Sequence, residues 1–144
     1  FIVDKLKGFE LDNIESVGPF ESEAGPVTHL RTNINAELLE NSPWAIAKSL
    51  HPTPAVSGMP RNKALQLIAA TEKHQRDLYA GILGVLDVDT TRLFVNLRCA
   101  QIHENEIFLY VGGGFTALSV PLDEWDETEN KSKTLLNAIA EISK

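Results

Sequence analysis

The feature of this chain that most constrains its fold is an expected strand that runs into three glycines and is followed by a long helix. The strand is expected over residues 106–111, the glycines occupy positions 112–114, and Pro121 begins the helix. Glycine has no Cβ, so backbone N–H groups at this strand end can approach a ligand closely and bind an anion. A glycine triplet at a strand end is more often a bend or a bulge, so the triplet alone does not identify a site.

The expected final helix places two carboxylates and an ammonium group on one stripe. Glu124, Glu127 and Lys131 are spaced i, i+3 and i+7, which puts them on the same helix face. Glu127 and Lys131 alone form an ordinary surface pair that stabilises a helix by a few tenths of a kcal/mol. Alternatively, Glu127 binds a hard cation such as Mg²⁺, which prefers oxygen ligands, and Lys131 is a point charge for a substrate carboxylate. Because one carboxylate is a poor metal site, this second interpretation requires a further ligand elsewhere.

Composition narrows the class of protein. The 144 residues are 43% hydrophobic, enough for one globular domain with a sizeable core. The net charge of −7 and the lack of a Lys/Arg-rich run argue against nucleic acid or an anionic membrane as a partner. The single cysteine, Cys99, excludes an intrachain disulfide and a cysteine-based zinc cluster, and it fits a cytoplasmic protein.

The N-terminal end predicts a longer parent protein. The chain begins with Phe1, its only methionine is Met59, and residues 1–7 have the apolar spacing of a helix. We interpret the 144 residues as the C-terminal portion of a longer catalytic domain whose N-terminal half is absent. A processed N-terminus is the alternative.

The remaining pattern predicts an α+β fold in which an antiparallel β-sheet is packed by helices. Residues 15–26 are expected to form a polar loop because they contain several breakers, and residues 51–54 are expected not to be helical. The expected strands are residues 27–34, 79–87, 93–102 and 106–111, with the last two joined as a hairpin. The expected helices are residues 42–50, 62–74 and the segment that starts at Pro121.

Two further residues are candidates for a site. Arg98 lies within an expected strand, where an arginine is often solvent-facing; if it faces a pocket, its guanidinium suits a bidentate grip on a carboxylate. His29 also lies in an expected strand, where the alternative to a functional role is a hydrogen-bonded structural histidine.

Taken together, these segments resemble the chorismate-utilising enzymes, and specifically the isochorismate synthases. The matching segments are residues 27–32, 50–61, 76–84, 97–100, 110–114 and 124–131. They occur in the family's order and with family-like spacing over essentially the whole chain. In residues 51–55, His-Pro-Thr-Pro-Ala, salicylate synthases tend to have threonine where Ala55 stands, so this position favours isochorismate as the product.

The resemblance implies a role for each matching residue. It places His29 near the substrate ring, and it assigns Arg98 and the backbone of Gly112 and Gly113 to a substrate carboxylate. Lys131 would stabilise the bound anion. The residues that would line the pocket are Tyr79, Leu97 and Tyr110. Glu127 would bind Mg²⁺, with Glu124 as a supporting acid. The sequence departs from the family's pattern at Gly113, Phe115 and Val120, which could alter the shape of the pocket.

The family reaction implied by this resemblance moves a hydroxyl group from C4 to C2 of chorismate, for menaquinone or siderophore biosynthesis. In the family, a lysine activates water and a glutamic acid protonates the departing hydroxyl, and both lie in the N-terminal half, together with a second metal ligand. Residues 2–4 resemble the helix that follows that ligand. We therefore expect no general acid or base in this chain, no turnover by the chain alone, and the N-terminal half as its partner. The alternatives are a salicylate synthase and, in another class, a non-catalytic binding module.

Overall fold

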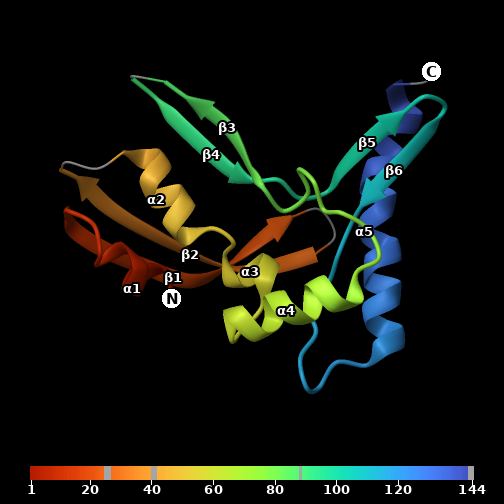
Figure 1. The fold of residues 1–144 in the computed structure, drawn as a ribbon, viewed down its shortest axis with the longest axis horizontal. Helices are drawn as coiled ribbons and strands as arrows, with labels where there is room; N and C mark the ends of the chain where they lie inside the picture. Colours follow the sequence, from red (N-terminus) through yellow and green to blue (C-terminus); the bar gives the residue numbers. More distant parts are fainter. Residues whose placement is uncertain (25–26, 40–41, 88, 143–144) are drawn as a thin grey trace. The chain divides into compact units, whose positions relative to one another are not determined.

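The computed structural model describes residues 1–24, 27–39, 42–87 and 89–142; for residues 23–24, 27–29 and 142 it describes the backbone alone. The helices are α1 (Ile2–Leu6), α2 (Pro43–Leu50), α3 (Pro54–Ser57), α4 (Arg61–Thr71) and α5 (Pro121–Ile142). The strands are β1 (Leu11–Ala24), β2 (Val27–Leu38), β3 (Ile82–Leu86), β4 (Thr91–Val95), β5 (Cys99–His103) and β6 (Glu106–Tyr110) (Figure 1). The chain divides into two compact units, Phe1–Leu50 and His51–Lys144.

The first unit is built on a long antiparallel hairpin of β1 and β2, with α1 in contact with α2. The expected polar loop over residues 15–26 is wrong for its described part, which belongs to β1. Gly18 and Pro19 are accommodated where the register shifts between Val17 and Phe20. Such a β-bulge lets a strand contain residues that normally break it. Gly18 has φ +122°, and a Cβ there would lie 2.8 Å from the carbonyl oxygen of Arg31, so glycine is required.

The second unit contains two further antiparallel hairpins, β3–β4 and β5–β6. The α+β class and the antiparallel pairing are therefore confirmed, with the described strands arranged as three two-stranded ladders. The predicted hairpin turn is also correct, because β5 ends at His103 and β6 begins at Glu106. β6 contacts α5, and the two elements run beside each other in Figure 1.

The single strand predicted over residues 93–102 is wrong, because it is broken into β4 and β5. At the break, the backbone N–H of Asn96 donates to the carbonyl of Gly81 at 2.8 Å, and its side-chain amide donates to the carbonyl of Leu78 at 2.9 Å. Arg98 then has φ +49°, which is a left-handed conformation that a strand does not contain. The strand predicted from residue 79 likewise begins only at Ile82, because residues 77–80 form a turn.

The helices agree more closely with the sequence. Helices beginning at Pro43 and Pro121 are confirmed. α4 ends at Thr71, earlier than predicted, because Glu72 adopts an extended conformation with ψ 131°. The segment from His51 to Thr53 is non-helical, as expected, but the same expectation is wrong for Pro54, which begins α3.

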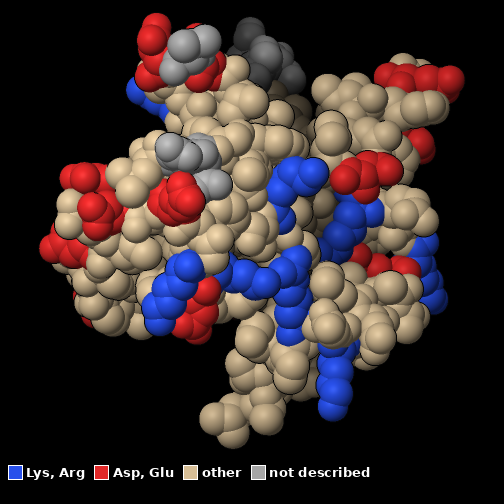
Figure 2. All heavy atoms as spheres, turned by 60° about the vertical axis from the view of Figure 1, so that its left-hand side comes forward, with Lys and Arg blue, Asp and Glu red and all other residues tan. Residues whose placement is uncertain are grey.

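Few apolar side chains are buried. Among the described residues the only buried hydrophobic side chains are Leu6 and Ala80. Phe94, Leu122 and Trp125 are each more than three-fifths exposed, so the apolar side of α5 faces outward over its first turns. On the face drawn in Figure 2, most of the surface belongs to residues other than Lys, Arg, Asp and Glu, with uncharged polar residues among them. Exposed apolar surface of this extent marks regions that contact other chain segments or proteins. No helix within the described residues is long and apolar enough to cross a membrane.

Candidate functional site

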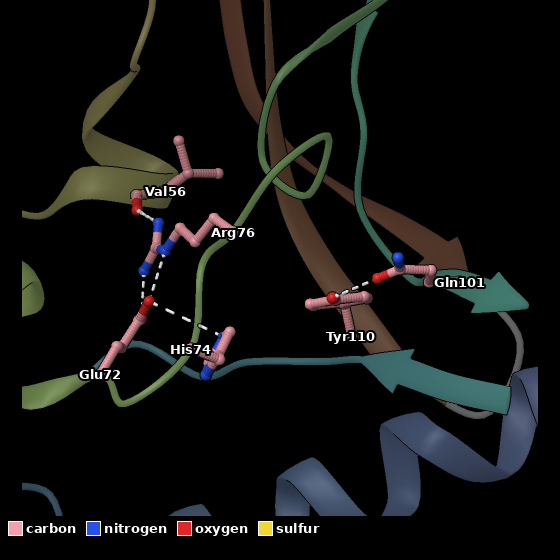
Figure 3. Close-up of polar contacts among 6 residues, drawn as sticks. All are labelled: Val56, Glu72, His74, Arg76, Gln101 and Tyr110. Atoms are coloured by element: carbon pink, nitrogen blue, oxygen red, sulfur yellow. Dashed lines mark hydrogen bonds and ion pairs between the residues drawn. The ribbon is translucent and has the colours of Figure 1, made fainter. Parts of the chain in front are cut away.

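Two stacked tyrosines form the centre of the site. The rings of Tyr79 and Tyr110 lie 5.5 Å apart between centroids, with an interplanar angle of 26°. Tyr79 comes from the turn before β3, and Tyr110 ends β6. The Tyr110 hydroxyl donates to Oε1 of Gln101 on β5 at 2.9 Å (Figure 3), which fixes the orientation of its ring. Aromatic pairs of this kind contribute about 0.5–1.5 kcal/mol beyond the area they bury.

The glycines after β6 lie against this stack and against α5. A Cβ placed on Gly112 would lie 2.7 Å from the Tyr79 hydroxyl oxygen, closer than real Cβ atoms approach another atom. A Cβ on Gly113 would lie 3.4 Å from Oε2 of Glu124, whereas a Cβ on Gly114 would meet no atom within 4 Å. The triplet therefore brings the backbone close to a tyrosine at its first position and to a carboxylate at its second.

Lys131 connects α5 to the glycine segment. Its Nζ donates a hydrogen bond to the carbonyl oxygen of Gly112 at 3.0 Å and forms an ion pair with Oε1 of Glu127 at 2.5 Å. The lysine side chain is 25% exposed and the glutamate 53%. The stripe predicted from helical spacing is therefore real, and it faces the strand end that the glycines form.

Glu124 is held in place by the loop before α5. The hydroxyl of Ser119 donates to Oε1 of Glu124 at 2.5 Å, and the same hydroxyl oxygen accepts a hydrogen bond from the backbone N–H of Thr116 at 3.0 Å. The second oxygen of the carboxylate lies beside Gly113, where a Cβ would be in van der Waals contact with it at 3.4 Å.

Glu124 and Glu127 are the residues of this helix stripe that could hold a metal ion. Mg²⁺ is commonly bound by one or two carboxylates together with water and substrate oxygens, and Glu124 and Glu127 provide carboxylates one helical turn apart. The described residues contain no group of three His, Cys, Asp or Glu side chains that could hold a metal, so the remaining oxygens must come from water, substrate or other residues.

The sequence interpretation missed an ion pair beside the tyrosines. Arg76 binds the carboxylate of Glu72 through two hydrogen bonds, at 2.8 and 2.5 Å. These bonds hold the pKa of Glu72 below its ordinary value, while burial raises the pKa of Tyr79. The two residues are four apart, but α4 ends before Glu72, so helical spacing gave no reliable signal for the pair.

This ion pair predicts a pH-dependent stability. Because the folded-state pKa of Glu72 lies below its ordinary value of 4.5, the pair stabilises the fold above that pH, and the contribution is lost as pH falls through the folded-state pKa. We expect Glu72→Gln to lower the melting temperature at pH 7 and to lower it less at pH 3. Thermal unfolding of both proteins across this range checks the result; an equal difference in melting temperature at both pH values would contradict it.

The structure does not bring every predicted residue to this place. Leu97 and Arg98 are exposed in the break between β4 and β5, and within the described residues no hydrogen bond or ion pair links them to Tyr110, Gly112 or Lys131. Ala55 is exposed on α3. His29 has a described backbone in β2, opposite Ser22, but its side chain lies outside the described part of the structure.

Comparisons with known proteins identify the family. The family model for chorismate binding enzymes matches residues 1–140. The chain is 44% identical over 93 residues to the isochorismate synthase EntC of Escherichia coli K12, covering 64% of this chain and 24% of that protein. It is 33% identical over 137 residues to the isochorismate synthase MenF of Haemophilus influenzae, covering 95% of this chain and 31% of that protein.

The fold is similar to a crystal structure of a Bacillus anthracis protein assigned as the 2,3-dihydroxybenzoate-specific isochorismate synthase DhbC. The TM-score is 0.87 at 33% identity, over 96% of this chain and 38% of that one. The chain thus spans less than a third of the length of the two curated relatives. From the match over almost its full length, the chain belongs to the chorismate binding enzyme family.

Proposed function

We propose that this chain forms the carboxylate- and metal-binding wall of a Mg²⁺-dependent isochorismate synthase, an isomerase that converts chorismate into isochorismate. The observation that carries the proposal is the position of Lys131, which α5 holds between the Glu127 carboxylate and the carbonyl of Gly112. This places a cation, a carboxylate that can hold a metal ion and a glycine backbone together, and these groups suit the recognition of a small dicarboxylate. The isochorismate synthases among its relatives support the choice of reaction.

The cationic and backbone groups would bind the anionic parts of the substrate. The ammonium of Lys131 attracts a carboxylate, and the backbone N–H groups of residues 112–114 can donate to it, because the glycines leave them accessible. The stacked faces of Tyr79 and Tyr110 would line the pocket beside this point. Arg98 would add a bidentate contact, and His29 would lie near the ring.

Glu127, with Glu124 beside it, would hold Mg²⁺. Bound there, the ion would neutralise a substrate carboxylate and act as a Lewis acid. Ser119 keeps the Glu124 carboxylate oriented through its hydrogen bond, so this residue need not be reordered when the ion binds. Glu127 would then lie at the metal-bound end of the substrate, and Lys131 would lie at the end bound by its ammonium group.

The hydroxyl transfer also needs a general base at C2 and a general acid at C4. We place both in the part of the relatives' length that this chain does not span, together with a further metal ligand. That part would be the chain's principal partner, and the exposed apolar side chains of this chain fit such a contact. The enzyme would act in the cytoplasm, where the free thiol of Cys99 is stable, and its product would serve menaquinone or siderophore biosynthesis.

Product analysis tests this proposal. The full-length protein that contains this chain, incubated with chorismate and Mg²⁺, is expected to form isochorismate, separated by chromatography and identified by NMR. The 144-residue chain alone is expected to form none. Salicylate and pyruvate as the main products would indicate a salicylate synthase, and unchanged chorismate that nevertheless binds would indicate a non-catalytic binding module.

A further inference from the structure

We propose that Arg76, held by Glu72, is a positioning residue: it fixes the ring of Tyr79 and thereby the shape of the glycine wall at Gly112. Arg76 would touch no substrate atom. Its effect on ligand binding rests on the proposed function, whereas its effect on Tyr79 does not.

The guanidinium of Arg76 is bound on three of its nitrogens. Nε and Nη2 donate to the two carboxylate oxygens of Glu72, and Nη1 donates to the carbonyl oxygen of Val56 at 3.2 Å (Figure 3). These acceptors come from α3 and from the residue after α4. A bidentate grip sets the plane of the guanidinium as well as its position, and both side chains are less than a third exposed, so the group is fixed in orientation.

The fixed guanidinium lies over the ring of Tyr79, with its Cζ 5.7 Å from the ring centroid. Cations in this range are attracted to an aromatic face, by about 0.5–1 kcal/mol at exposed sites and more when desolvated. The same ring stacks on Tyr110. Contacts with Arg76 and with Tyr110 therefore both restrict the position of the Tyr79 ring.

The backbone that carries Tyr79 is unusually constrained. Asp77 and Ala80, two residues before and one after it, have φ of 48° and 60°, a left-handed conformation that costs roughly 1–2 kcal/mol for such residues. Beyond Tyr79, the N–H of buried Ala80 donates to the carbonyl of Asn96 at 2.7 Å. The turn is thus anchored by Arg76 at one end and by Asn96 at the other, and strain of this kind persists where the surroundings impose a conformation needed for function.

The position of the Tyr79 ring also affects Gly112 in the proposed binding wall. The hydroxyl of Tyr79 occupies the space that a Cβ on Gly112 would need, and the carbonyl of Gly112 accepts the hydrogen bond from Lys131. A continuous series of contacts therefore runs from Glu72 through Arg76 and Tyr79 to the strand end. If Arg76 is loosened, the Tyr79 ring is free to move away from Gly112 while every group assigned to the substrate is still present.

Fluorine NMR tests the positioning role directly. The 144-residue chain has only two tyrosines, and both are in the stack, so labelling with 3-fluorotyrosine gives two resonances that Tyr79→Phe and Tyr110→Phe assign. Arg76→Met is expected to shift or broaden the Tyr79 resonance, Arg76→Lys to shift it less, and Glu72→Gln to shift it in the same direction. Lys133→Met is the control for charge, because within the described residues the Lys133 ammonium donates only to the exposed Asn130, three positions earlier on α5, and it should leave both resonances in place.

A Tyr79 resonance at its wild-type position in both Arg76→Met and Glu72→Gln would overturn the proposal. If Arg76→Met unfolds, both resonances collapse to the unfolded position, and the isosteric Glu72→Gln variant decides the matter. A calorimetric titration of the full-length protein with chorismate in the presence of Mg²⁺ supplies the second arm: Arg76→Met should weaken binding about tenfold, with partial recovery in Arg76→Lys. If the wild-type full-length protein does not bind chorismate, the proposed function fails, and the ligand-free resonance shifts of the 144-residue chain still decide the role of Arg76.

Discussion

Replacing Glu127 with glutamine is expected to lower chorismate turnover by the full-length protein on the order of a hundredfold. The substitution keeps the size of the side chain but removes the negative charge that the proposed Mg²⁺ needs, and loss even of groups that only support a metal ligand costs about 10–100-fold. It also removes the ion-pair partner of Lys131. The measurement is the steady-state rate as a function of Mg²⁺ and chorismate concentration.

The two consequences of Glu127→Gln can be separated by these titrations. Loss of a metal ligand raises the Mg²⁺ concentration needed for half-maximal rate, whereas a displaced Lys131 raises the chorismate KM at saturating Mg²⁺. Glu129→Gln, which makes the same change in charge on the same helix, should retain nearly the wild-type rate. Turnover and Mg²⁺ dependence in Glu127→Gln that match those of Glu129→Gln would show that Glu127 does not hold the ion.

Gly112→Ala is expected to have the second large effect, because the new methyl group would lie 2.7 Å from the Tyr79 hydroxyl. The hydroxyl ends a ring that is stacked on Tyr110 and covered by Arg76, so it cannot move aside freely. Overpacking of this kind typically costs about 1–3 kcal/mol of unfolding free energy. Chorismate binding should weaken at least tenfold, about 1.4 kcal/mol. Chemical denaturation and a binding titration measure the two effects.

The chain offers a matched control and a rescue for Gly112→Ala. Gly114→Ala adds the same methyl group two residues away, where no atom lies within 4 Å, and it should be close to neutral. Tyr79→Phe removes the hydroxyl that the methyl group meets, so the double variant Gly112→Ala/Tyr79→Phe should be more stable than Gly112→Ala alone. Equal losses in Gly112→Ala and Gly114→Ala, or no recovery in the double variant, would show that the contact with Tyr79 is not what makes glycine necessary.

The sequence predicted those elements whose signals are local. The β5–β6 hairpin and α5 follow from a short turn and from apolar periodicity. The strand β1 was missed because Gly18 and Pro19 normally end a strand, whereas here a shift in register absorbs them. The break between β4 and β5 depends on hydrogen bonds from Asn96 to residues 78 and 81, and no local pattern reveals bonds made at that distance along the chain.

In the candidate site, too, the sequence predicted the features with local signals and missed those that depend on contacts between elements. Helical spacing placed Glu124, Glu127 and Lys131 on one stripe, and the structure directs this stripe at Gly112. The glycine triplet predicted a close approach of the backbone to a ligand, which stays a prediction, and it did not indicate the Tyr79 hydroxyl that lies beside Gly112. A role for Arg76 was not predicted, because that role depends on contacts that only the folded structure shows. The roles of His29 and Arg98 remain predictions.

The most direct test of the central claim is a crystal structure of the full-length protein with isochorismate and Mg²⁺ bound. The account predicts a ligand carboxylate within hydrogen-bonding distance of Lys131 Nζ or the backbone N–H groups of residues 112–114, and a metal ion coordinated by Glu127. A ligand bound with neither Lys131 nor the glycine segment in contact with it would contradict the account.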